Sequence, residues 1–376
     1  MDRAPAPSGT LDEDPAFLST QLITCIGNKR ALLDLVDEGV MRARNRLGGR
    51  KLDMLDAFAG SGVVSRSFKR HARRLWVNDL EPFAGVAAEC YLHNYDEYPR
   101  AACESALGRV REALAGPLRE DGLIARLYAP RNDEAIVPGE RVFYTTRNAR
   151  YLDTARGLIG NLPGALRPFF LGPLLAEASI HANTSGVFKG FYKNPETGLG
   201  QFGGRKGDAL QRIKGHIELR PPVLSRFSCE TVVLQGDANV VCPALPELDL
   251  AYLDPPYNQH PYGSNYFMLN LLVDYEEPRS ISKVSGIPRD WRRSAYNKAG
   301  SAAAALAALI ESLKAKFVLV SFNSEGFIGR EEMLDMLGRH GRVSIVERAY
   351  NTFRGSRNLR GRGRYVREFL FVLEKS

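Results

Sequence analysis

The sequence predicts an open α/β sheet into which a mainly helical segment is inserted. Apolar, strand-like segments alternate with amphipathic, helix-like segments before residue 99 and again after residue 228, which is the pattern of an α/β domain. Between these limits, residues 99–228 carry apolar side chains at helical spacing and contain no long strand-like run. A chain of 376 residues is long enough for both parts.

A polar lead-in precedes the first ordered signal. Residues 1–20 begin with MDRAPAPSGTLDEDPAF, which has no apolar signal core and predicts a disordered segment. Residues 24–33, TCIGNKRALL, then place Gly27 at a tight turn before a helix, with Lys29 beside the backbone donors of the helix start. The arrangement suits an anionic group, and an ordinary glycine turn into a surface helix is the alternative.

Residues 52–70, LDMLDAFAGSGVVSRSFKR, predict a strand, a glycine loop and an amphipathic helix. Gly60 and Gly62 follow the strand directly, so the backbone can approach a bound nucleoside without a clash from a Cβ atom. The next strand ends at Asp79, 23 residues after Asp56 (79 minus 56), where nucleotide-binding sheets place an acid on the ribose diol. Neither a Walker loop nor the full GxGxxG of dinucleotide enzymes is present. The two signals together predict an adenosine-containing cofactor.

The helical insertion ends in a polar, glycine-rich and basic run over residues 183–222. Its aromatic residues, Phe188, Phe191, Tyr192 and Phe202, are interleaved with basic ones, namely Lys189, Lys193, Arg205, Lys206, Arg212 and Lys214. Basic side chains contact phosphates, and aromatic or amide groups contact bases, so the run predicts a nucleic-acid face. A solvated loop with a few packing aromatics is the alternative.

Two further strands end in acids. TVVLQGDANVV at residues 231–241 ends its strand at Gly236 and Asp237, and LDLAYLDPPY at residues 248–257 ends its strand at Asp254. Asp237 lies 17 residues before Asp254 (254 minus 237), so neighbouring strands can place both acids along one edge of the sheet. Open α/β sheets carry their chemistry at that edge.

The turn Asp254, Pro255, Pro256 and Tyr257 holds a carboxylate, a free carbonyl and an aromatic ring close together, because proline fixes φ and removes a backbone donor. The exocyclic amine of a nucleobase is a poor nucleophile, since its lone pair is delocalised into the ring. Two acceptors on its hydrogens, the Asp254 carboxylate and the Pro255 carbonyl, would localise that lone pair for attack on a sulfonium methyl group. Tyr257 would stack on the base.

The remaining chain predicts a helix near residues 265–275, a polar linker over 276–300, an alanine-rich helix and a strand, and then a helix, strand, loop and strand. The last loop places arginines between glycines and favours phosphate contact, through Arg354, Arg357, Arg360 and Arg362.

The composition indicates the cellular compartment and the kind of binding partner. A net charge of +8 and a pI near 9.2 favour a polyanionic partner. Five cysteines form no CxxC pair, which predicts neither a metal site nor a disulfide framework and favours a reducing, cytoplasmic environment. No apolar run approaches the ~20 residues needed to cross a bilayer.

The motif order resembles the alpha group (D12 class, Dam-like) of DNA adenine-specific methyltransferases. The resemblance covers most of the chain from about residue 20 and rests on an ordered set of motifs: IGNKRALL at 26–33, DAFAGSG at 56–62, Asp79 after a strand, GDA at 236–238 and DPPY at 254–257. It implies a Rossmann-like, mixed and largely parallel seven-stranded sheet with helices on both faces and the last strand inserted antiparallel. Residues 21–98 and 229–376 would form the catalytic domain, and residues 99–228 the target-recognition insertion.

The resemblance also implies roles for single residues. S-adenosylmethionine would be bound by Gly27, Lys29, Asp56, Phe58, Gly60, Gly62, Asp79, Asp237 and Asp254. Asp254 to Tyr257 would hold an adenine flipped out of duplex DNA within a specific sequence, and the product would be N6-methyladenine. The alternatives are another amine (cytosine N4, an RNA adenine or a protein glutamine) or a non-catalytic DNA-binding protein on the same fold. A cognate restriction nuclease is a candidate partner, a monomer or a dimer is compatible with the sequence, and the expected location is the cytoplasm, at the nucleoid.

Overall fold

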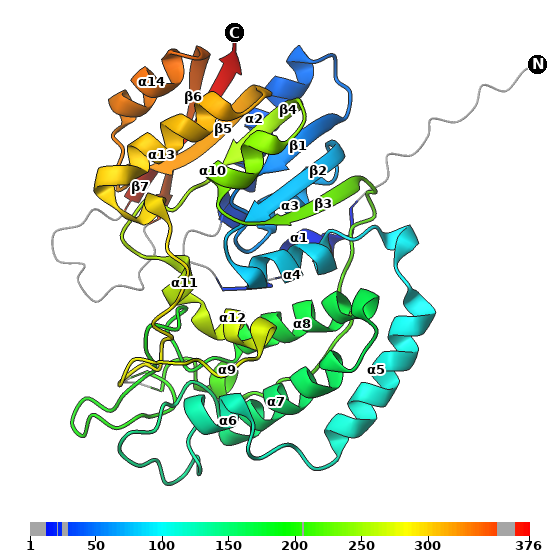
Figure 1. The fold of residues 1–376 in the computed structure, drawn as a ribbon, viewed down its shortest axis with the longest axis vertical. Coiled ribbons are helices and arrows are strands. Elements are labelled where there is room, and N and C mark those ends of the chain that lie inside the picture. The colour runs from blue at the N-terminus through cyan, green and yellow to red at the C-terminus, as the bar shows by residue number, and fades with distance from the viewer. Residues whose placement is uncertain (1–12, 21, 25–28, 205–206, 352–364) are drawn as a thin grey trace, which may run out of the picture.

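A computed structural model describes residues 13–20, 22–24, 29–204, 207–351 and 365–376. Its centre is a seven-stranded sheet in the order β3-β2-β1-β4-β5-β7-β6 (Figure 1). The strands are β1 (Leu52–Asp56), β2 (Ala72–Asp79), β3 (Glu230–Gln235), β4 (Leu248–Leu253), β5 (Ala315–Asn323), β6 (Gly341–Asn351) and β7 (Tyr365–Lys375).

The strand directions confirm the predicted mixed sheet. Strands β1 to β5 pair in parallel, whereas β7 runs antiparallel to both β5 and β6 between which it is inserted. β4 is buried at every residue, as expected for a central parallel strand covered on both faces. The apolar run that precedes Asp254 therefore crosses the middle of the sheet.

The order of the strands creates a switch point beside β1. The chain proceeds outward from β1 to β2 and β3, and then returns to the other side of β1 with β4. Loops at the carboxyl ends of β1 and β4 thus leave in opposite directions, and open α/β sheets bind ligands in the resulting crevice. Three of the strand-terminal acids singled out in the sequence, Asp56, Asp79 and Asp254, lie on this edge.

Helices cover both faces of the sheet, as predicted. On one face, α2 (Leu33–Arg46) and α3 (Val63–Phe68) share an apolar core with β1 and β2. On the other, α13 (Ala299–Ser312) and α14 (Arg330–Gly338) share a core with β4, β5 and β7. The burial of apolar side chains on both faces makes the sheet a rigid support for the residues at its edge.

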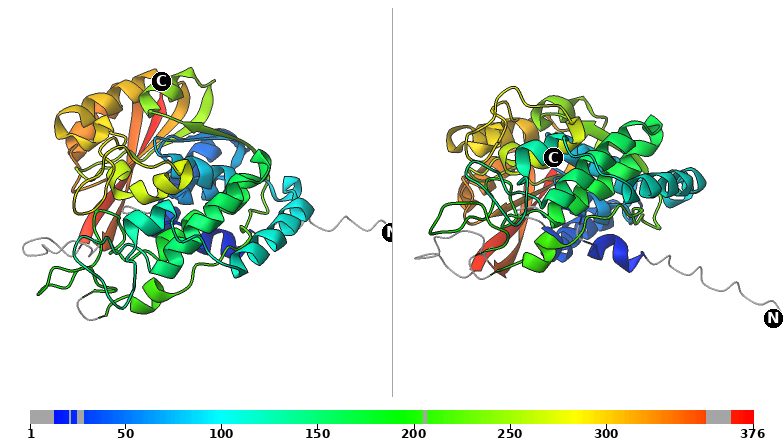
Figure 2. Two further views of the ribbon diagram at one scale, coloured as in Figure 1. Left: turned by 60° about the horizontal axis from the view of Figure 1, so that its bottom comes forward. Right: turned by 90° about the horizontal axis from the view of Figure 1, so that it is seen from below.

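The described part of residues 99–228 forms helices and no named strand. These helices build a layer below the sheet in Figure 1, and they are α5 (Arg100–Ala115), α6 (Leu123–Tyr128), α7 (Thr146–Gly160), α8 (Arg167–Ile180) and α9 (Leu210–Lys214). Their apolar side chains form one core with α4 (Pro82–Tyr91) and α12 (Phe267–Asp274), which belong to the chain before and after the insertion. The insertion is therefore packed continuously onto the sheet domain. In both views of Figure 2, α5 and the antiparallel strands β6 and β7 lie on opposite sides of the molecule.

The predicted disorder of residues 1–20 is wrong for its last part. Residues Pro15–Ser19 form helix α1, whose first turn is capped by Asp14, because the Asp14 carboxylate accepts from the Ala16 backbone N–H at 2.9 Å. Phe17 is completely buried, and the Arg66 guanidinium lies 4.8 Å from the centre of its ring. An apolar anchor behind a capping residue is enough to dock this short helix. Residues 1–12 lie outside the described part.

The segment 276–300 is not the linker that the sequence predicts. The Tyr128 hydroxyl of α6 donates to the Gly286 carbonyl at 2.7 Å, and Tyr296 is 2% exposed. Gly263 shows how closely the segment packs, because a Cβ there would lie 2.6 Å from the Arg292 carbonyl oxygen. The segment connects α12 to α13, and these contacts pack it against the rest of the protein at several points along its length.

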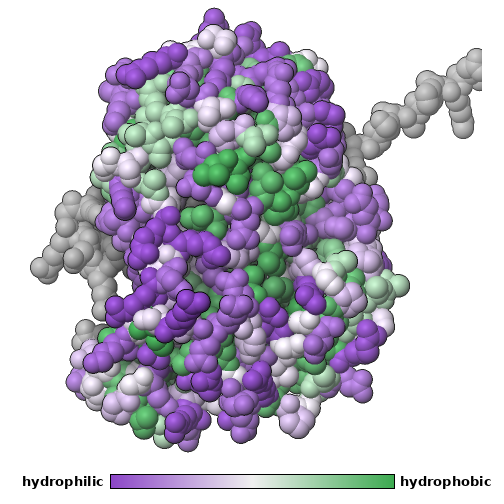
Figure 3. All heavy atoms as spheres, in the orientation of Figure 1, coloured by the Kyte–Doolittle hydropathy of each residue, from purple (hydrophilic) through white to green (hydrophobic). Residues whose placement is uncertain are grey.

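Among the described residues, no helix is both long and apolar enough to cross a bilayer. Polar side chains dominate the face shown in Figure 3, and apolar atoms gather near its centre, where the sheet layer meets the helical layer.

Candidate active site

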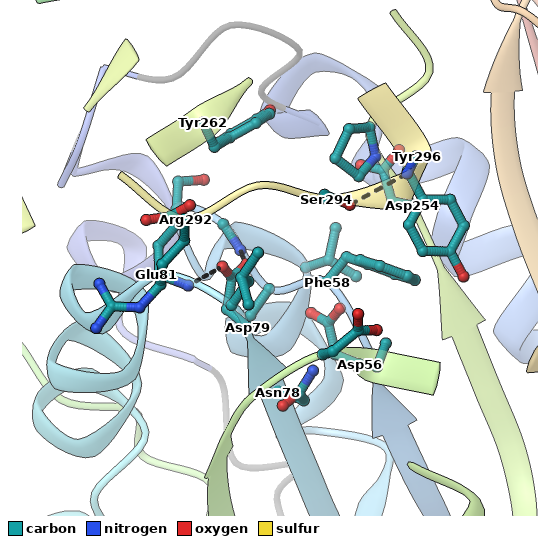
Figure 4. Close-up of a pocket in the computed structure, with 18 of the residues that line it drawn as sticks. Asp56, Phe58, Asn78, Asp79, Glu81, Asp254, Tyr262, Arg292, Ser294 and Tyr296 are labelled. Atoms are coloured by element: carbon teal, nitrogen blue, oxygen red, sulfur yellow. Dashed lines mark hydrogen bonds between the residues drawn. The ribbon is translucent and has the colours of Figure 1, made fainter. Parts of the chain in front are cut away.

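A cavity opens at the carboxyl edge of the sheet, beside the switch point (Figure 4). It encloses about 870 Å³, open solvent at its mouth included. It is lined by residues from the ends of β1, β2, β3 and β4 and from the segment after α12. Most of the predicted cofactor residues line it, namely Lys29, Asp56, Phe58, Gly60, Asp79, Asp237 and Asp254.

The glycine loop after β1 is shaped by its backbone. Gly60 and Gly62 have φ angles of 53° and 74°, a region that disfavours residues with a Cβ, and a Cβ on either glycine would meet open space. This left-handed conformation points the Gly60 N–H toward Asp79, and the N–H donates a hydrogen bond to the Asp79 carboxylate at 2.7 Å. Asp79 also accepts from the Glu81 N–H at 2.9 Å. Gly62 shapes the turn without lining the cavity, and Gly27 lies outside the described residues.

The floor of the cavity is acidic. Burial raises the pKa of Asp56 to about 7, against the effect of the Ser65 hydroxyl, which donates to this carboxylate at 2.5 Å. Burial and the neighbouring Asp79 raise the pKa of Glu81 to about 7, and the Asn270 amide donates to Glu81 at 2.6 Å. Carboxylates crowded in a buried site ionise more readily when a cation is bound among them.

Asn78 adds a neutral acceptor that the sequence reasoning missed. Its Nδ2 donates to the carbonyls of Ala57 and Gly236, at 3.1 Å each, which fixes the orientation of the carboxamide. The Asn78 Oδ1 is buried and has no hydrogen-bond partner among the described residues. A buried acceptor of this kind in the wall of a cavity fits a ligand that donates a hydrogen bond. The sequence placed Asn78 directly before Asp79, and strand-end position is the signal that could have found it.

A second, smaller cavity of about 360 Å³ adjoins the first. The two cavities share Asp254, Pro256 and Tyr262, and the second is otherwise lined by Pro255, Tyr257, Asn258, His260 and Asn265. All four residues of the predicted catalytic turn therefore line one cavity, and two of them also face the other. Two ligands could meet at this wall.

Lys29 and Asp254 form an ion pair that the sequence did not predict. The Lys29 Nζ lies 2.9 Å from an Asp254 carboxylate oxygen, and the lysine is 3% exposed. Burial by itself would lower the pKa of Lys29, but the adjacent Asp254 carboxylate raises it well above its usual value. Burial raises the pKa of Asp254, and Lys29 opposes this rise. The lysine thus supplies the counter-charge of the carboxylate in the predicted catalytic turn.

Tyr257 is held in place by its neighbours. Its ring packs edge-on against Phe322 with the centroids 5.6 Å apart, and the Lys29 Nζ lies 5.5 Å from the ring centre. Burial raises the pKa of Tyr257 to about 12, so that its phenol stays protonated near neutrality. A neutral, fixed aromatic ring beside a cavity is suited to stack on a planar ligand.

The segment from Arg292 to Asn297 crosses the mouth of the first cavity (Figure 4). The Tyr296 hydroxyl donates to the Asn239 side-chain oxygen at 2.7 Å, and the Tyr296 ring packs edge-on against Phe58 at 5.1 Å. The Asn297 amide donates to the carbonyl of Asn258 at 2.9 Å, one residue after the catalytic turn. The sequence contains no local signal for these contacts, because they depend on long-range packing.

The structure separates the predicted DNA-binding residues into groups. Lys193 and Lys214 lie over the rings of Phe191 and Phe202, at 5.2 and 5.8 Å from the ring centres. The Lys189 Nζ lies 3.5 Å from a His260 ring nitrogen, next to the smaller cavity. Six of the predicted DNA contacts lie outside the described residues, namely Arg205, Lys206, Arg354, Arg357, Arg360 and Arg362.

Arg212 has a structural role that contradicts its prediction as a phosphate contact. Its guanidinium donates to the carbonyls of Ile180, Ala182 and Thr184, the last two at 2.9 and 3.2 Å. These carbonyls lie at the end of α8 and just beyond it, where backbone acceptors have no partner within the helix. Because the guanidinium satisfies them, we do not retain Arg212 as a DNA contact.

Comparison with known proteins gives the family. Residues 26–334 match the sequence model of D12 class N6 adenine-specific DNA methyltransferases. The Type II methyltransferase M.NlaIII of Neisseria lactamica is 28% identical over 331 residues, covering 85% of this chain and 90% of that protein. M.CviAII of Paramecium bursaria Chlorella virus 1 is 25% identical over 93% of this chain and 97% of that protein. M.FokI of Planomicrobium okeanokoites is 24% identical over 93% of this chain and 52% of its own length. The chain belongs to the D12 class of N6 adenine-specific DNA methyltransferases.

Proposed function

We propose that this protein transfers the methyl group of S-adenosylmethionine to N6 of an adenine that is flipped out of duplex DNA within a specific sequence. The observation that carries the proposal is the pair of adjoining cavities with Asp254 in their shared wall. One cavity has the acids and the glycine loop of a nucleoside site, and the other has the catalytic turn. A methyl donor and an acceptor base would meet at Asp254.

The larger cavity fits the cofactor on which D12 class methyltransferases depend. Asp79, anchored by the glycine loop, would accept from the ribose hydroxyls, and Asp237 would contact the adenine ring. Asp56 and the unpartnered Asn78 Oδ1 supply buried acceptors for the cationic amino group of the methionine part. When bound, the cofactor supplies an electrophilic methyl group on a sulfonium.

The smaller cavity positions the amine. The Asp254 carboxylate and the Pro255 carbonyl would accept the two N6 hydrogens and so localise the nitrogen lone pair. Lys29 keeps the carboxylate charged and fixed, and Tyr257 stacks on the base. Positioning and preorganised electrostatics then account for most of the rate effect, and no covalent intermediate is needed.

Flipping is required because the predicted catalytic turn lies in the wall of a recessed cavity. A stacked, paired base cannot enter such a site, and extrusion costs a few kcal/mol. Lys189, Lys193 and Lys214 of the insertion, together with the predicted arginines outside the described residues, would offset this cost through phosphate contacts. The proximity of Lys189 to His260 supports a DNA path that runs from the insertion to the smaller cavity.

The functional test uses purified protein, S-adenosylmethionine labelled in its methyl group, and duplex DNA. The expected product after digestion of the DNA to nucleosides is labelled N6-methyl-2′-deoxyadenosine. When the methylated adenines are mapped, they should all lie within one recognition sequence. Parallel reactions with RNA, with protein and with DNA carrying no adenine are the controls. Label in N4-methylcytosine, in RNA or in protein would overturn the proposal. Adenine methylation without any sequence preference would overturn its sequence-specific part.

We also propose that a restriction nuclease of the same specificity accompanies this enzyme. The Type II designation of M.NlaIII and M.CviAII supports this partner. DNA from cells that express the protein should resist cleavage by a restriction nuclease that recognises the methylated sequence, whereas DNA from cells without the protein should be cut.

Cofactor affinity is expected to increase with pH. Asp56 and Glu81 both have pKa values of about 7 without a bound cation, so near pH 6 each carboxyl is mainly protonated. A cationic cofactor favours the ionised carboxylates, so binding releases protons and tightens as pH rises through 7. We expect the Kd for S-adenosylmethionine to fall about 3- to 10-fold between pH 6 and pH 8. Calorimetric titration measures this, and S-adenosylhomocysteine, which keeps the amino group assigned to Asp56, should show the same direction of change. A Kd independent of pH would contradict the expectation.

A further inference from the structure

The smaller cavity contains a buried carboxamide that the proposed reaction does not use. Asn265 lines this cavity together with Asp254, and Asn265 is 1% exposed. Its Oδ1 is buried and has no hydrogen-bond partner among the described residues. A buried polar group without a partner costs free energy, so a carboxamide left open in a cavity wall indicates a ligand with complementary polar atoms.

The main chain of Asn265 is fixed from two sides. It is the last residue of α11 (Tyr262–Asn265), and its N–H donates to the Pro261 carbonyl at 3.0 Å. Its carbonyl accepts from the N–H of Phe188, in the insertion, at 2.7 Å. The side chain therefore projects from a rigid position at the contact between the catalytic turn and the target-recognition insertion.

Asn183 shows what a structural buried asparagine looks like in this protein. Its Nδ2 donates to the carbonyls of Val142 and Gln201, at 2.7 and 2.8 Å, and its Oδ1 accepts from the Gly203 N–H at 3.0 Å. Asn183 is 0% exposed and its carboxamide is fully used. Asn265 is equally buried but makes no such set of contacts among the described residues, which separates it from the asparagines that hold the fold together.

We infer that Asn265 recognises the target adenine by donating a hydrogen bond to a ring nitrogen next to the amino group. The inference rests on the proposed function, in which Asp254 and the Pro255 carbonyl take both N6 hydrogens. The acceptors that remain on the flanking edges of the base are N1 and N7. A half-turn of the carboxamide exchanges Oδ1 and Nδ2, so the position of Asn265 can present a donor to either nitrogen.

This contact provides a selection that Asp254 cannot provide alone. The catalytic turn accepts from any planar exocyclic amine, including the N4 amine of cytosine or the N2 amine of guanine. A donor at a fixed place beside the amine requires an acceptor nitrogen at one position of the ring. An N7 contact would select adenine over cytosine, whereas an N1 contact would be matched by cytosine N3 and would select only against rings without that nitrogen. A purine that lacks this nitrogen would leave the Asn265 donor buried and unpaired.

Two variants test the donor. Asn265→Asp keeps the size of the side chain but replaces the amide donor by an acceptor, and Asn265→Ala removes both. We expect either variant to lower kcat/KM for duplex DNA by about 10- to 100-fold. The Kd for S-adenosylmethionine should stay unchanged, because Asn265 does not line the cofactor cavity. Asn161→Asp, at the exposed end of α7, is the matched control and should behave as the wild type. A buried carboxyl also costs free energy where the native residue only fills space, so the base analogues, not this loss alone, decide the role of the amide.

Base analogues then identify the partner atom. Duplexes carrying adenine, 1-deazaadenine or 7-deazaadenine at the target position remove N1 or N7 in turn. The wild-type enzyme should be slowed at least about tenfold by one of the two analogues, and the Asn265→Ala variant should lose that penalty. A wild type that ignores both analogues, or a variant that keeps the penalty, would overturn the role of Asn265. If the wild type transfers no methyl group to DNA adenine at all, the proposed function fails before this inference is reached.

Discussion

Asp254→Asn is expected to reduce kcat for methyl transfer by about 10²- to 10³-fold. The substitution keeps the shape of the side chain but removes the negative charge that strengthens its hydrogen bond with the N6 amine. It also leaves the Lys29 ammonium, 2.9 Å away in the native protein, buried without its counter-charge. Single-turnover measurements with labelled cofactor separate this chemical effect from product release.

Cofactor binding distinguishes a chemical role of Asp254 from a collapse of the site. Asp56, Asp79 and Asp237 remain in the larger cavity, so we expect the Kd for S-adenosylmethionine to change by less than about tenfold. Pro255→Ala is the matched control, because its proposed contribution comes from the backbone carbonyl that alanine retains. Its loss should stay within about tenfold, as expected for a less rigid turn. Equal activity of Asp254→Asn and the wild type would refute the proposed role of the carboxylate.

Lys29→Met is expected to lower kcat/KM at pH 7 by about 100-fold and to move the rise of the pH profile to higher pH. Burial raises the pKa of Asp254, and Lys29 opposes this rise. Without the ammonium, the pKa of Asp254 increases further, and a smaller fraction of the carboxyl is ionised at pH 7. Activity should therefore recover as the pH is raised, and the profile of kcat/KM against pH from 6 to 10 measures this shift.

Lys316 of β5 is the control for Lys29, because it pairs with an aspartate at the other end of β4. Lys316 lies 3.6 Å from Asp249, at the amino end of β4, on the opposite edge of the sheet from the cavities. Lys316→Met removes one positive charge and one lysine–aspartate pair without touching the site, so its pH profile should match that of the wild type. A uniform loss of activity in Lys29→Met at every pH would show that the lysine acts through folding or cofactor binding, not through the ionisation of Asp254.

Much of the fold follows from local patterns. Apolar runs that end in acids predicted the strands of the sheet, and the family resemblance implied the antiparallel insertion of the last strand, which the observed order and pairing of the strands confirm. Strand-terminal position alone was enough to bring Asp56, Asp79 and Asp254 to one edge, because the carboxyl ends of parallel strands meet there. The glycine loop could also be predicted from the sequence, because a left-handed turn selects glycine at single positions.

Predictions based on residue type alone were less successful. The basic run of the insertion predicted phosphate contacts, yet Arg212 is used to satisfy the end of α8. The polar composition of residues 276–300 predicted a linker, yet Tyr296 from this segment closes one side of the larger cavity. Charge and polarity say that a side chain can form polar contacts, but not whether its partner is solvent, a ligand or the protein itself.

The sequence alone therefore predicted the fold class and the sheet edge at which Asp56, Asp79 and Asp254 meet, because periodicity and strand ends are local properties of the chain, and the order of its motifs resembled the family that the comparison shows. Only the tertiary structure decided that Lys29 pairs with Asp254, more than two hundred residues away, and that Asn297 bonds to the loop after the catalytic turn. It also decided that Asn265 lies in the smaller cavity with an unused carboxamide. These relations join segments that are far apart in the chain, and they arise only when the sheet and the insertion pack together.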